Sequence, residues 1–220
     1  MLIARINRKF NKSLLPHSVL RVMTNYYTTR RIQTIDSTLC IAVPDTWYLV
    51  AMKTIHSFEY LLKYSDFDYL FRTNLGSYVH LENLQNHLQQ MPRRKLYLAK
   101  SGTFTVRGYF ENQLYGSGSG FAISRDVVER LVVDKKDIIQ QQLAYNGRMV
   151  DDVLFGRKII SDYGIDVIEG KRTDANLEQL QKDISIVKKD DYHIYFRKAK
   201  DVRCFDLVHN FMIENSSNKP

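Results

Sequence analysis

The stretch that decides the fold runs from Tyr115 to Val128 and reads Tyr-Gly-Ser-Gly-Ser-Gly-Phe-Ala-Ile-Ser-Arg-Asp-Val-Val. Its alternating glycines predict a close approach of the backbone to another group, because glycine carries no side chain. A short apolar strand, residues 121–124, and a helix capped by Ser124 are expected to follow. After that helix comes Val150-Asp-Asp-Val-Leu-Phe-Gly156, in which two adjacent carboxylates stand where another helix should begin. A glycine loop facing an acid pair suggests a catalytic cleft.

On either side of this stretch, strands and helices are expected to alternate, as in an α/β sheet covered on both faces. The apolar run from Ser37 to Val43 ends at Pro44 and suits a buried strand. Further strands are predicted over residues 68–72, 95–100, 103–107, 165–168 and 193–197, and helices over residues 45–64, 81–91, 151–163 and 200–213. With 220 residues, 44% of them apolar, the chain can bury a sizeable core. We therefore predict one α/β domain over residues 36–220.

The charge of the chain is concentrated at one end. Residues 1–35 hold seven Lys and Arg and no Asp or Glu, so the net charge of +8 leaves +1 for the other 185 residues. A nearly neutral body argues against nucleic acid as a partner. Apolar residues among the charges let this basic N-terminal arm, residues 1–35, contact an anionic membrane surface or act as a targeting segment. A frayed leader is an equally good interpretation.

Cysteine content and hydropathy exclude several classes. Cys40 and Cys204 are too few for a disulfide framework or for a four-ligand metal site. No apolar run approaches the ~18 residues needed to span a bilayer, and the N-terminus lacks the features of a signal peptide. We therefore expect a cytoplasmic protein, with residues 1–35 as its route to peripheral membrane contact.

Four segments, in a fixed order between residues 40 and 160, carry a resemblance to a known enzyme family. They are Asp45-Thr-Trp-Tyr-Leu-Val-Ala-Met-Lys53-Thr54, Phe67-Asp-Tyr-Leu-Phe-Arg72-Thr73, Gly116-Ser-Gly-Ser-Gly120-Phe-Ala-Ile-Ser124 and Asp151-Asp-Val-Leu-Phe-Gly156. Together they resemble the Fringe-related β-1,3-glycosyltransferases of glycosyltransferase family 31. The resemblance implies an A-type glycosyltransferase fold, with a Rossmann-like mixed sheet flanked by helices. Because only 44 residues precede Asp45, it also implies a fold shortened at the N-terminus.

The activity that the resemblance implies is the inverting transfer of a hexose from a nucleotide-sugar donor to a glycan or glycoconjugate acceptor, such as a surface polysaccharide. In the family a Glu-Asp-Val motif closes the site, and its second acid is the general base. The matching residue is Asp152, with Asp151 in place of the Glu. An acceptor hydroxyl is a poor nucleophile until a carboxylate removes its proton. Acids in the first turn of a helix are also favoured by the helix dipole, so a structural role is the alternative.

The glycine segment also has two interpretations. In the family it lines the pocket for the acceptor and the donor sugar, and the corresponding residues are Gly116, Ser117, Gly118, Ser119 and Gly120. The alternative is a flexible turn between two strands, where Ser-Gly alternation is common.

The donor site departs from the family. Three aspartates, whose last member binds the manganese that bridges the donor diphosphate, are replaced by Asn74, Leu75 and Gly76. A divalent cation prefers charged oxygen ligands, so Mn²⁺ binding in the usual manner is doubtful. Arg72, Thr73, Asn74 and Ser77 are the predicted donor-binding residues, and Arg72 would supply the missing positive charge.

His193 lies in the region where family members place a late metal-binding histidine, which makes it the candidate metal ligand. A single histidine on a strand is more often structural.

Three hypotheses follow. The leading one is a Fringe-like glycosyltransferase with Asp152 as base. The second is a catalytically inactive relative that binds a glycan or supports a partner transferase as a scaffold. The third is a basic module that binds nucleic acid or membrane through residues 1–35, and it predicts a steep salt dependence that disappears when those residues are removed.

Overall fold

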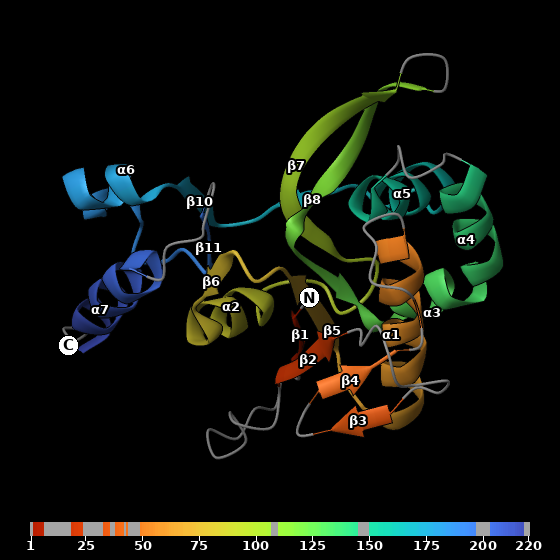
Figure 1. Ribbon diagram of the computed structural model, residues 1–220, viewed down its shortest axis with the longest axis horizontal. Coiled ribbons are helices and arrows are strands. Elements are labelled where there is room, and N and C mark those ends of the chain that lie inside the picture. Colours follow the sequence, from red (N-terminus) through yellow and green to blue (C-terminus); the bar gives the residue numbers. More distant parts are fainter. Residues whose placement is uncertain are drawn as a thin grey trace. The chain divides into compact units, whose positions relative to one another are not determined.

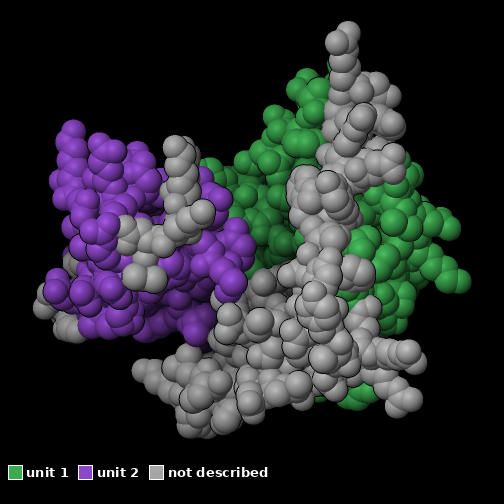
Figure 2. Space-filling view, in the orientation of Figure 1, with its two compact units in different colours: residues 1–73, 92–169 green, residues 74–91, 170–220 purple. Residues whose placement is uncertain are grey.

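The computed structural model describes residues 2–6, 19–23, 33–35, 38–41, 43, 49–106, 110–144, 150–196 and 203–217. The chain divides into two compact units, each discontinuous in sequence (Figures 1 and 2). Unit 1 comprises residues 1–73 and 92–169, and unit 2 comprises residues 74–91 and 170–220. Within the range 36–220 predicted as one domain, the chain leaves unit 1 after Thr73 and returns to it at Pro92.

Unit 1 is built on a mixed eight-stranded sheet. Its strands are β1 (Leu2–Ile6), β2 (Val19–Met23), β3 (Gln33–Ile35), β4 (Thr38–Cys40), β5 (Tyr69–Thr73), β7 (Tyr97–Val106), β8 (Phe110–Ser124) and β9 (Ile168–Glu169). They lie in the order β3-β4-β2-β1-β5-β8-β7-β9. Only the β2–β4 and β7–β9 pairs among these described ladders are parallel. Because β1 pairs with β5 and β2 with β1, the described parts of the predicted arm belong to the sheet.

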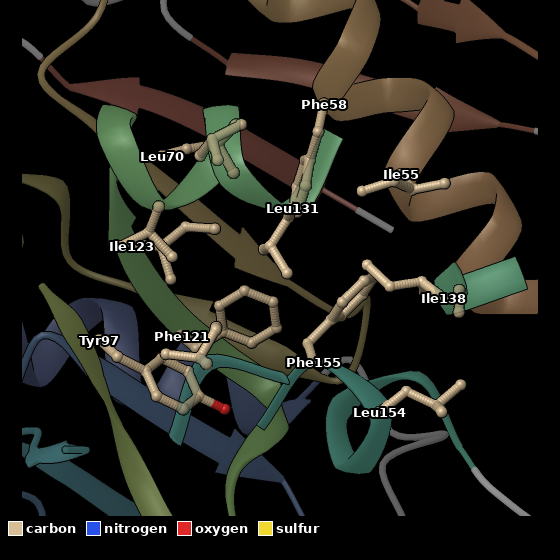
Figure 3. Close-up of a cluster of buried hydrophobic side chains, with 14 of the residues drawn as sticks. Ile55, Phe58, Leu70, Tyr97, Phe121, Ile123, Leu131, Ile138, Leu154 and Phe155 are labelled. Atoms are coloured by element: carbon tan, nitrogen blue, oxygen red, sulfur yellow. The ribbon is translucent and has the colours of Figure 1, made fainter. Parts of the chain in front are cut away.

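Helices cover one face of this sheet and confirm the predicted α/β class. They are α1 (Val50–Tyr64), α3 (Arg125–Val133), α4 (Lys135–Ala144) and α5 (Asp151–Arg157), which continues into a π-helix (Lys158–Asp162). Figure 3 shows the core between the helices and the strands, where Phe58 and Phe155 pack with their ring centroids 5.9 Å apart. On β5, Leu70 joins this core, while Tyr69 and Phe71 point to the opposite face and are also buried. Burial on both faces explains why this strand is a continuous apolar run.

Helix α1 shows how the sequence pattern produces the packing. Ala51, Ile55 and Phe58 recur at helical spacing and are fully buried. The N-cap residue, Leu49, makes no side-chain cap bond. The side chain of Gln142, on α4, takes over this task, because its Oε1 accepts a hydrogen bond of 3.1 Å from the Met52 N–H. Asp45, the predicted cap, lies outside the described residues.

The entry to α3 holds two elements together. Ser124 is the N-cap residue, as predicted, but its hydroxyl makes no cap bond. It instead accepts a hydrogen bond of 2.9 Å from the backbone N–H of Leu96. Ser124 thus connects the end of β8 to Leu96, the residue before β7. Helix α3 begins directly after this connection, at Arg125.

Unit 2 is assembled from two distant segments of the chain. Its sheet has the order β10-β11-β6, formed by Arg172–Ala175, His193–Phe196 and Ser77–Val79, respectively. Its helices are α2 (Leu81–Leu88), α6 (Leu177–Lys182), a 3-10 helix (Ile184–Ile186) and α7 (Arg203–Ser217). Ile194 and Phe196 form a core with Val208 and Met212 of α7. Unit 2 therefore has an apolar cluster of its own.

The lengths of the helices bear on membrane association. The longest that the structure describes, α1 and α7, have 15 residues each, short of the roughly 20 that span a hydrocarbon core. In the described parts of the chain, no helix is long and apolar enough to cross a membrane.

Candidate active site

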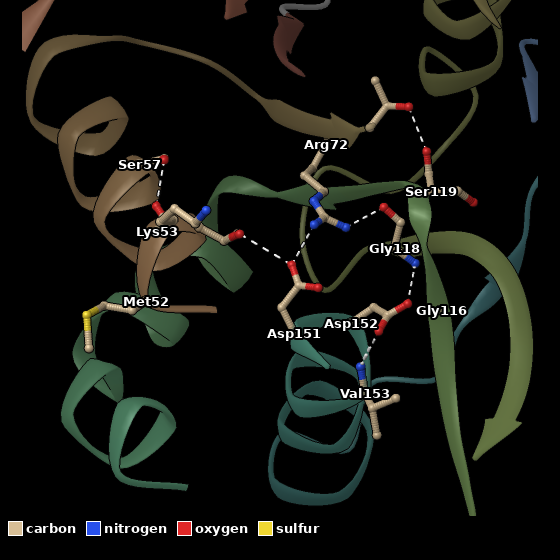
Figure 4. A network of polar contacts seen from close by, with 12 residues as sticks. Met52, Lys53, Ser57, Arg72, Gly116, Gly118, Ser119, Asp151, Asp152 and Val153 are labelled. Carbon is tan, nitrogen blue, oxygen red and sulfur yellow. Dashed lines mark hydrogen bonds and ion pairs between the residues drawn. The ribbon is translucent and has the colours of Figure 1, made fainter. Parts of the chain in front are cut away.

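Arg72, near the end of β5, links two parts of unit 1. Its side chain is only 8% exposed, and its Cζ lies 5.6 Å from the ring centroid of Phe121. Nη2 donates a hydrogen bond of 2.6 Å to Oδ2 of Asp151, and Nη1 donates to the backbone carbonyl of Gly118 (Figure 4). One guanidinium therefore ties the first turn of α5 to β8.

The two acids at the start of α5 have different partners, because successive residues of a helix point about 100° apart. Asp151 faces Arg72, and its Oδ2 also accepts a 3.4 Å hydrogen bond from the Thr54 hydroxyl on α1. Asp152 faces β8, where its Oδ2 accepts a 2.7 Å hydrogen bond from the Gly118 N–H. Its Oδ1 accepts from the Val153 N–H at 3.0 Å. The adjacent carboxylates therefore connect the start of α5 to different elements: Asp151 to β5 and α1, and Asp152 to β8.

The glycine segment is part of strand β8 rather than the loop expected from its composition. Its pairing with β7 shifts register here, because Gly116 opposes Ser101 while Phe121 opposes Ala99. Residues 117–119 therefore lack a place in the described ladders with β7 and β5. Side chains contact three of their backbone groups: Arg72 and Asp152 bind the Gly118 carbonyl and N–H, and the Thr73 hydroxyl donates to the Ser119 carbonyl at 2.6 Å. The segment is a bulge clamped by its neighbours.

The glycines are required by packing within the protein. A Cβ at Gly118 would lie 2.6 Å from Nη1 of Arg72 and 2.8 Å from Oδ2 of Asp152. A Cβ at Gly116 would lie 2.6 Å from the hydroxyl of Tyr97, which accepts the Gly116 N–H at 2.7 Å. The space in front of both glycines is therefore filled by protein side chains, which explains their alternation without a bound sugar.

Other predicted pocket residues lie beside these glycines. Ser117 and Ser119, whose Oγ atoms are 2.9 Å apart, alternate with the glycines along β8. Gly120 is buried and pairs with Thr73 of β5. A sugar-binding role for this segment remains a prediction.

The electrostatics of the acid pair are uneven. Burial and the neighbouring charge of Asp151 raise the pKa of Asp152 to about 6, and the Gly118 N–H and the Arg72 charge oppose this shift only in part. The Arg72 guanidinium is the cation beside both carboxylates, but its hydrogen bond goes to Asp151 and not to Asp152. Burial also raises the pKa of Tyr97, which keeps its hydroxyl protonated. With a pKa of about 6, Asp152 is mostly ionised at neutral pH and takes up a proton more readily than an ordinary aspartate.

The predicted donor residues beyond Thr73 form a turn in unit 2. Oδ1 of Asn74 accepts hydrogen bonds from the Gly76 N–H at 3.0 Å and from the Ser77 hydroxyl at 2.9 Å. Leu75 between them is 57% exposed. An amide oxygen used twice within its own turn, an apolar side chain and a glycine do not fit a divalent cation, so the family's manganese site is not reproduced here.

His193, the predicted metal ligand, is buried in β11 of unit 2, opposite Val79 of β6 and Arg172 of β10. Within the described ranges, no group of three or more His, Cys, Asp or Glu side chains is placed to hold a metal ion. The role of His193 as a metal ligand stays a prediction.

Two site residues were not singled out from the sequence. Thr54 lies in one of the four resembling segments, and that membership was the available signal. Tyr97, whose hydroxyl accepts the Gly116 N–H and lies 3.3 Å from the Gly116 carbonyl, gave no signal, since an apolar strand commonly contains tyrosine.

No protein-family model and no curated protein matches the chain. Among solved structures, it is similar to a glycosyltransferase involved in the glycosylation of the major capsid of PBCV-1, with a TM-score of 0.44 and 12% identity over 80% of this chain and 82% of that chain. A likeness this loose does not transfer a function.

Proposed function

We propose that this protein is a nucleotide-sugar-dependent glycosyltransferase of the inverting type, with Asp152 as the general base. The observation that carries the proposal is the convergence of an acid pair, an arginine and a glycine bulge that lie far apart in the sequence. The resemblance to Fringe-related enzymes adds support, since it independently matched Asp152 to the base.

In the proposed reaction, the acceptor hydroxyl gives its proton to Asp152 while its oxygen bonds to the anomeric carbon of the donor sugar. The bond from that carbon to the diphosphate oxygen breaks at the same time, and its electron pair leaves with the diphosphate. Inversion requires the base and the leaving group to lie on opposite sides of the sugar.

The raised pKa of Asp152 suits this role. A carboxylate with a pKa of about 6 is mostly ionised at pH 7, yet it binds a proton about a hundredfold more tightly than one at the ordinary 3.8. The Gly118 N–H and the Val153 N–H fix its two oxygens without using all of their lone pairs. Asp151 is not proposed as the base, because Arg72 and Thr54 already contact it.

The test begins with calorimetric binding of a panel of nucleoside diphosphates and their sugars, with and without Mn²⁺. Donors that bind are then assayed for transfer and hydrolysis with wild type, Asp152→Asn and Asp137→Asn. Asp137 is a matched control, because its carboxylate, on α4, accepts a hydrogen bond from Lys158 of the π-helix. We expect Asp152→Asn to keep donor binding and to lose about 10²- to 10⁴-fold in turnover, while Asp137→Asn retains it.

The pH dependence sharpens the test. Turnover by wild type should rise with pH through about 6, as Asp152 becomes ionised. Failure of a folded wild-type protein to bind any nucleotide, or full turnover by Asp152→Asn, would refute the proposal. Binding that requires Mn²⁺ would show that the metal has ligands other than Asn74 and its neighbours.

A second candidate, a catalytically inactive glycosyltransferase-like binding or scaffold protein, is favoured by the turn at Asn74, Leu75 and Gly76. That turn offers no carboxylate to a metal-bound diphosphate. This candidate predicts glycan or sugar-nucleotide binding without turnover, and no difference between wild type and Asp152→Asn in any assay of transfer.

A further inference from the structure

Arg72, Asp151, Asp152 and Gly118 form a closed ring of contacts. The guanidinium contacts Asp151, Asp152 follows Asp151 in the chain, the Gly118 N–H donates to Asp152, and the Gly118 carbonyl accepts from the guanidinium. We propose that Arg72 is a positioning residue, which holds Gly118 so that its N–H is aimed at the carboxylate of Asp152. The catalytic meaning of this inference rests on the proposed function, in which Asp152 is the base.

The backbone at Gly118 needs such support. Residues 117–119 lie in the register shift of β8, outside its described ladders with β7 and β5. Glycine has wide conformational freedom, so strand pairing alone would not orient its N–H. Two hydrogen bonds hold this backbone in place of strand pairing. Arg72 donates to the Gly118 carbonyl, and the Thr73 hydroxyl donates to the Ser119 carbonyl.

The shape of arginine matters here as well as its charge. The two terminal nitrogens of the guanidinium point to different acceptors, one on α5 and one on β8, and a lysine ammonium has no such fixed fork. Nε of Arg72 is buried and has no hydrogen-bond partner among the described residues. The side chain is thus placed to reach Asp151 and Gly118 with its terminal nitrogens, although this leaves a third donor unsatisfied.

This role differs from the donor-binding role expected for Arg72. With both terminal nitrogens engaged and 6% of the residue exposed, a donor diphosphate would have to displace Asp151 or Gly118 to bind it. A donor-binding residue affects donor affinity, whereas a positioning residue affects turnover at unchanged donor affinity.

The test uses a spectroscopic signal that needs no substrate. The amide resonance of Gly118 should shift with pH as Asp152 titrates, because its N–H donates to Oδ2. The charged and titratable groups facing Asp152 are Asp151 on α5, Arg72 on β5 and Tyr97 on β7. In Arg72→Lys, which keeps the positive charge, we expect the Gly118 response to be lost while the acid pair still titrates.

Arg72→Met and Arg125→Lys complete the set. Arg72→Met removes the charge and the fork, so we expect both loss of the Gly118 response and an upward shift in the pH at which the acid pair takes its first proton. Arg125→Lys is the matched control, since Arg125 pairs with Asp66 and Glu129 outside the site and should leave the response unchanged. If Arg72→Met does not fold, Arg72→Lys alone decides.

The outcomes separate this inference from the proposed function. A Gly118 response that is absent in wild type, or intact in folded Arg72→Lys, overturns the positioning role. Loss of the response in a protein that shows no transferase activity supports the positioning role and counts against the function. Where activity exists, Arg72→Lys should lower kcat by about ten- to a hundredfold and keep the donor Kd within about twofold. A large rise in donor Kd at unchanged kcat would mean that Arg72 binds the donor.

Discussion

Two charged clusters occupy the same helical stretch of unit 1, one at the start of α5 and one at the start of the π-helix that follows. In the first, Arg72 pairs with Asp151 at 2.6 Å beside Asp152. In the second, Lys158 reaches three carboxylates, at 3.4, 2.7 and 2.8 Å. They belong to Asp134, Asp137 and Asp162. Each cluster thus contains more acids than bases around one cation.

Burial makes the two clusters behave differently. The side chains of Arg72 and Asp151 are 8% and 9% exposed, whereas that of Asp137 is 48% exposed. Near solvent, the hydrogen bond from Lys158 lowers the pKa of Asp137. In the buried cluster, the acid left with less compensation, Asp152, has its pKa raised. The same arrangement, several acids around one cation, therefore lowers the pKa of a carboxyl group near solvent and leaves one raised in the interior.

The largest expected effect comes from breaking the buried pair. Arg72→Met leaves Asp151 without its cation, and we expect the free energy of unfolding to fall by about 3 to 5 kcal/mol. Urea denaturation of wild type and variant measures it. A loss no larger than that of an exposed ion pair would mean that burial does not distinguish the two clusters.

Gly118→Ala tests the packing of the buried cluster without removing a charge. The new Cβ would lie 2.6 Å from Nη1 of Arg72 and 2.8 Å from Oδ2 of Asp152, so both must move. We expect a loss of about 2 to 3 kcal/mol, in the upper part of the range for overpacking. Gly102→Ala is the control, because its Cβ would lie 3.2 Å from the ring of Tyr115, which can yield. Equal losses in both variants would contradict this explanation.

The two clusters should also respond to pH with opposite signs. The folded pKa of Asp152 is raised from 3.8 to about 6, so the native state binds more protons in that window and its stability falls as pH rises through it. This change is on the order of 3 kcal/mol, and Asp152→Asn should remove it.

The lowered pKa of Asp137 has the reverse effect. Its stabilisation is present above its ordinary pKa of 3.8 and is lost as pH falls through the lower folded value. Denaturation midpoints measured across the acid range, for wild type, Asp152→Asn and Asp137→Asn, separate the two windows. The assignment of the clusters is wrong if Asp137→Asn changes the slope above pH 4 and Asp152→Asn does not.

Lys158→Met is expected to have the smallest effect. Its partners are partly exposed, so we expect a loss of about 1 kcal/mol, reduced further at high salt. Chemical denaturation at low and high ionic strength measures both. A loss as large as that of Arg72→Met would show that this cluster, too, depends on burial.

The sequence predicted the local elements of the site well. The apolar spacing of α1, the run of β5 and the acids at the start of α5 are local patterns, and each produced an element close to its expected position. The proximity of Asp152 to the glycine segment was also predictable, because the resemblance places both segments at one site.

The glycine segment itself was misassigned in conformation. Composition suggested a loop, yet glycines at every second position also fit one face of a strand, and β8 has that form. What fills the space beside Gly116 and Gly118 depends on Tyr97, Arg72 and Asp152, which come from other elements. Such tertiary contacts leave no mark in the local pattern.

The division into two units was beyond the sequence pattern for a similar reason. The polar strand β10 reads Arg-Thr-Asp-Ala and lacks the alternation that predicts a strand. It forms because it lies beside β11, which pairs with β6 from the other half of unit 2. Strand pairing over such a distance in sequence is decided by the assembled sheet.

The interrupted course of unit 2 also sets an order of events during synthesis. Strand β6 emerges before most of unit 1, but its partner β11 follows only after the last strand of unit 1 has been made. The strands of unit 1 can therefore all pair while β6 still lacks β11, its partner in the sheet of unit 2. A released chain that ended between residues 169 and 193 would contain every strand of unit 1, while the sheet of unit 2 would still lack β11.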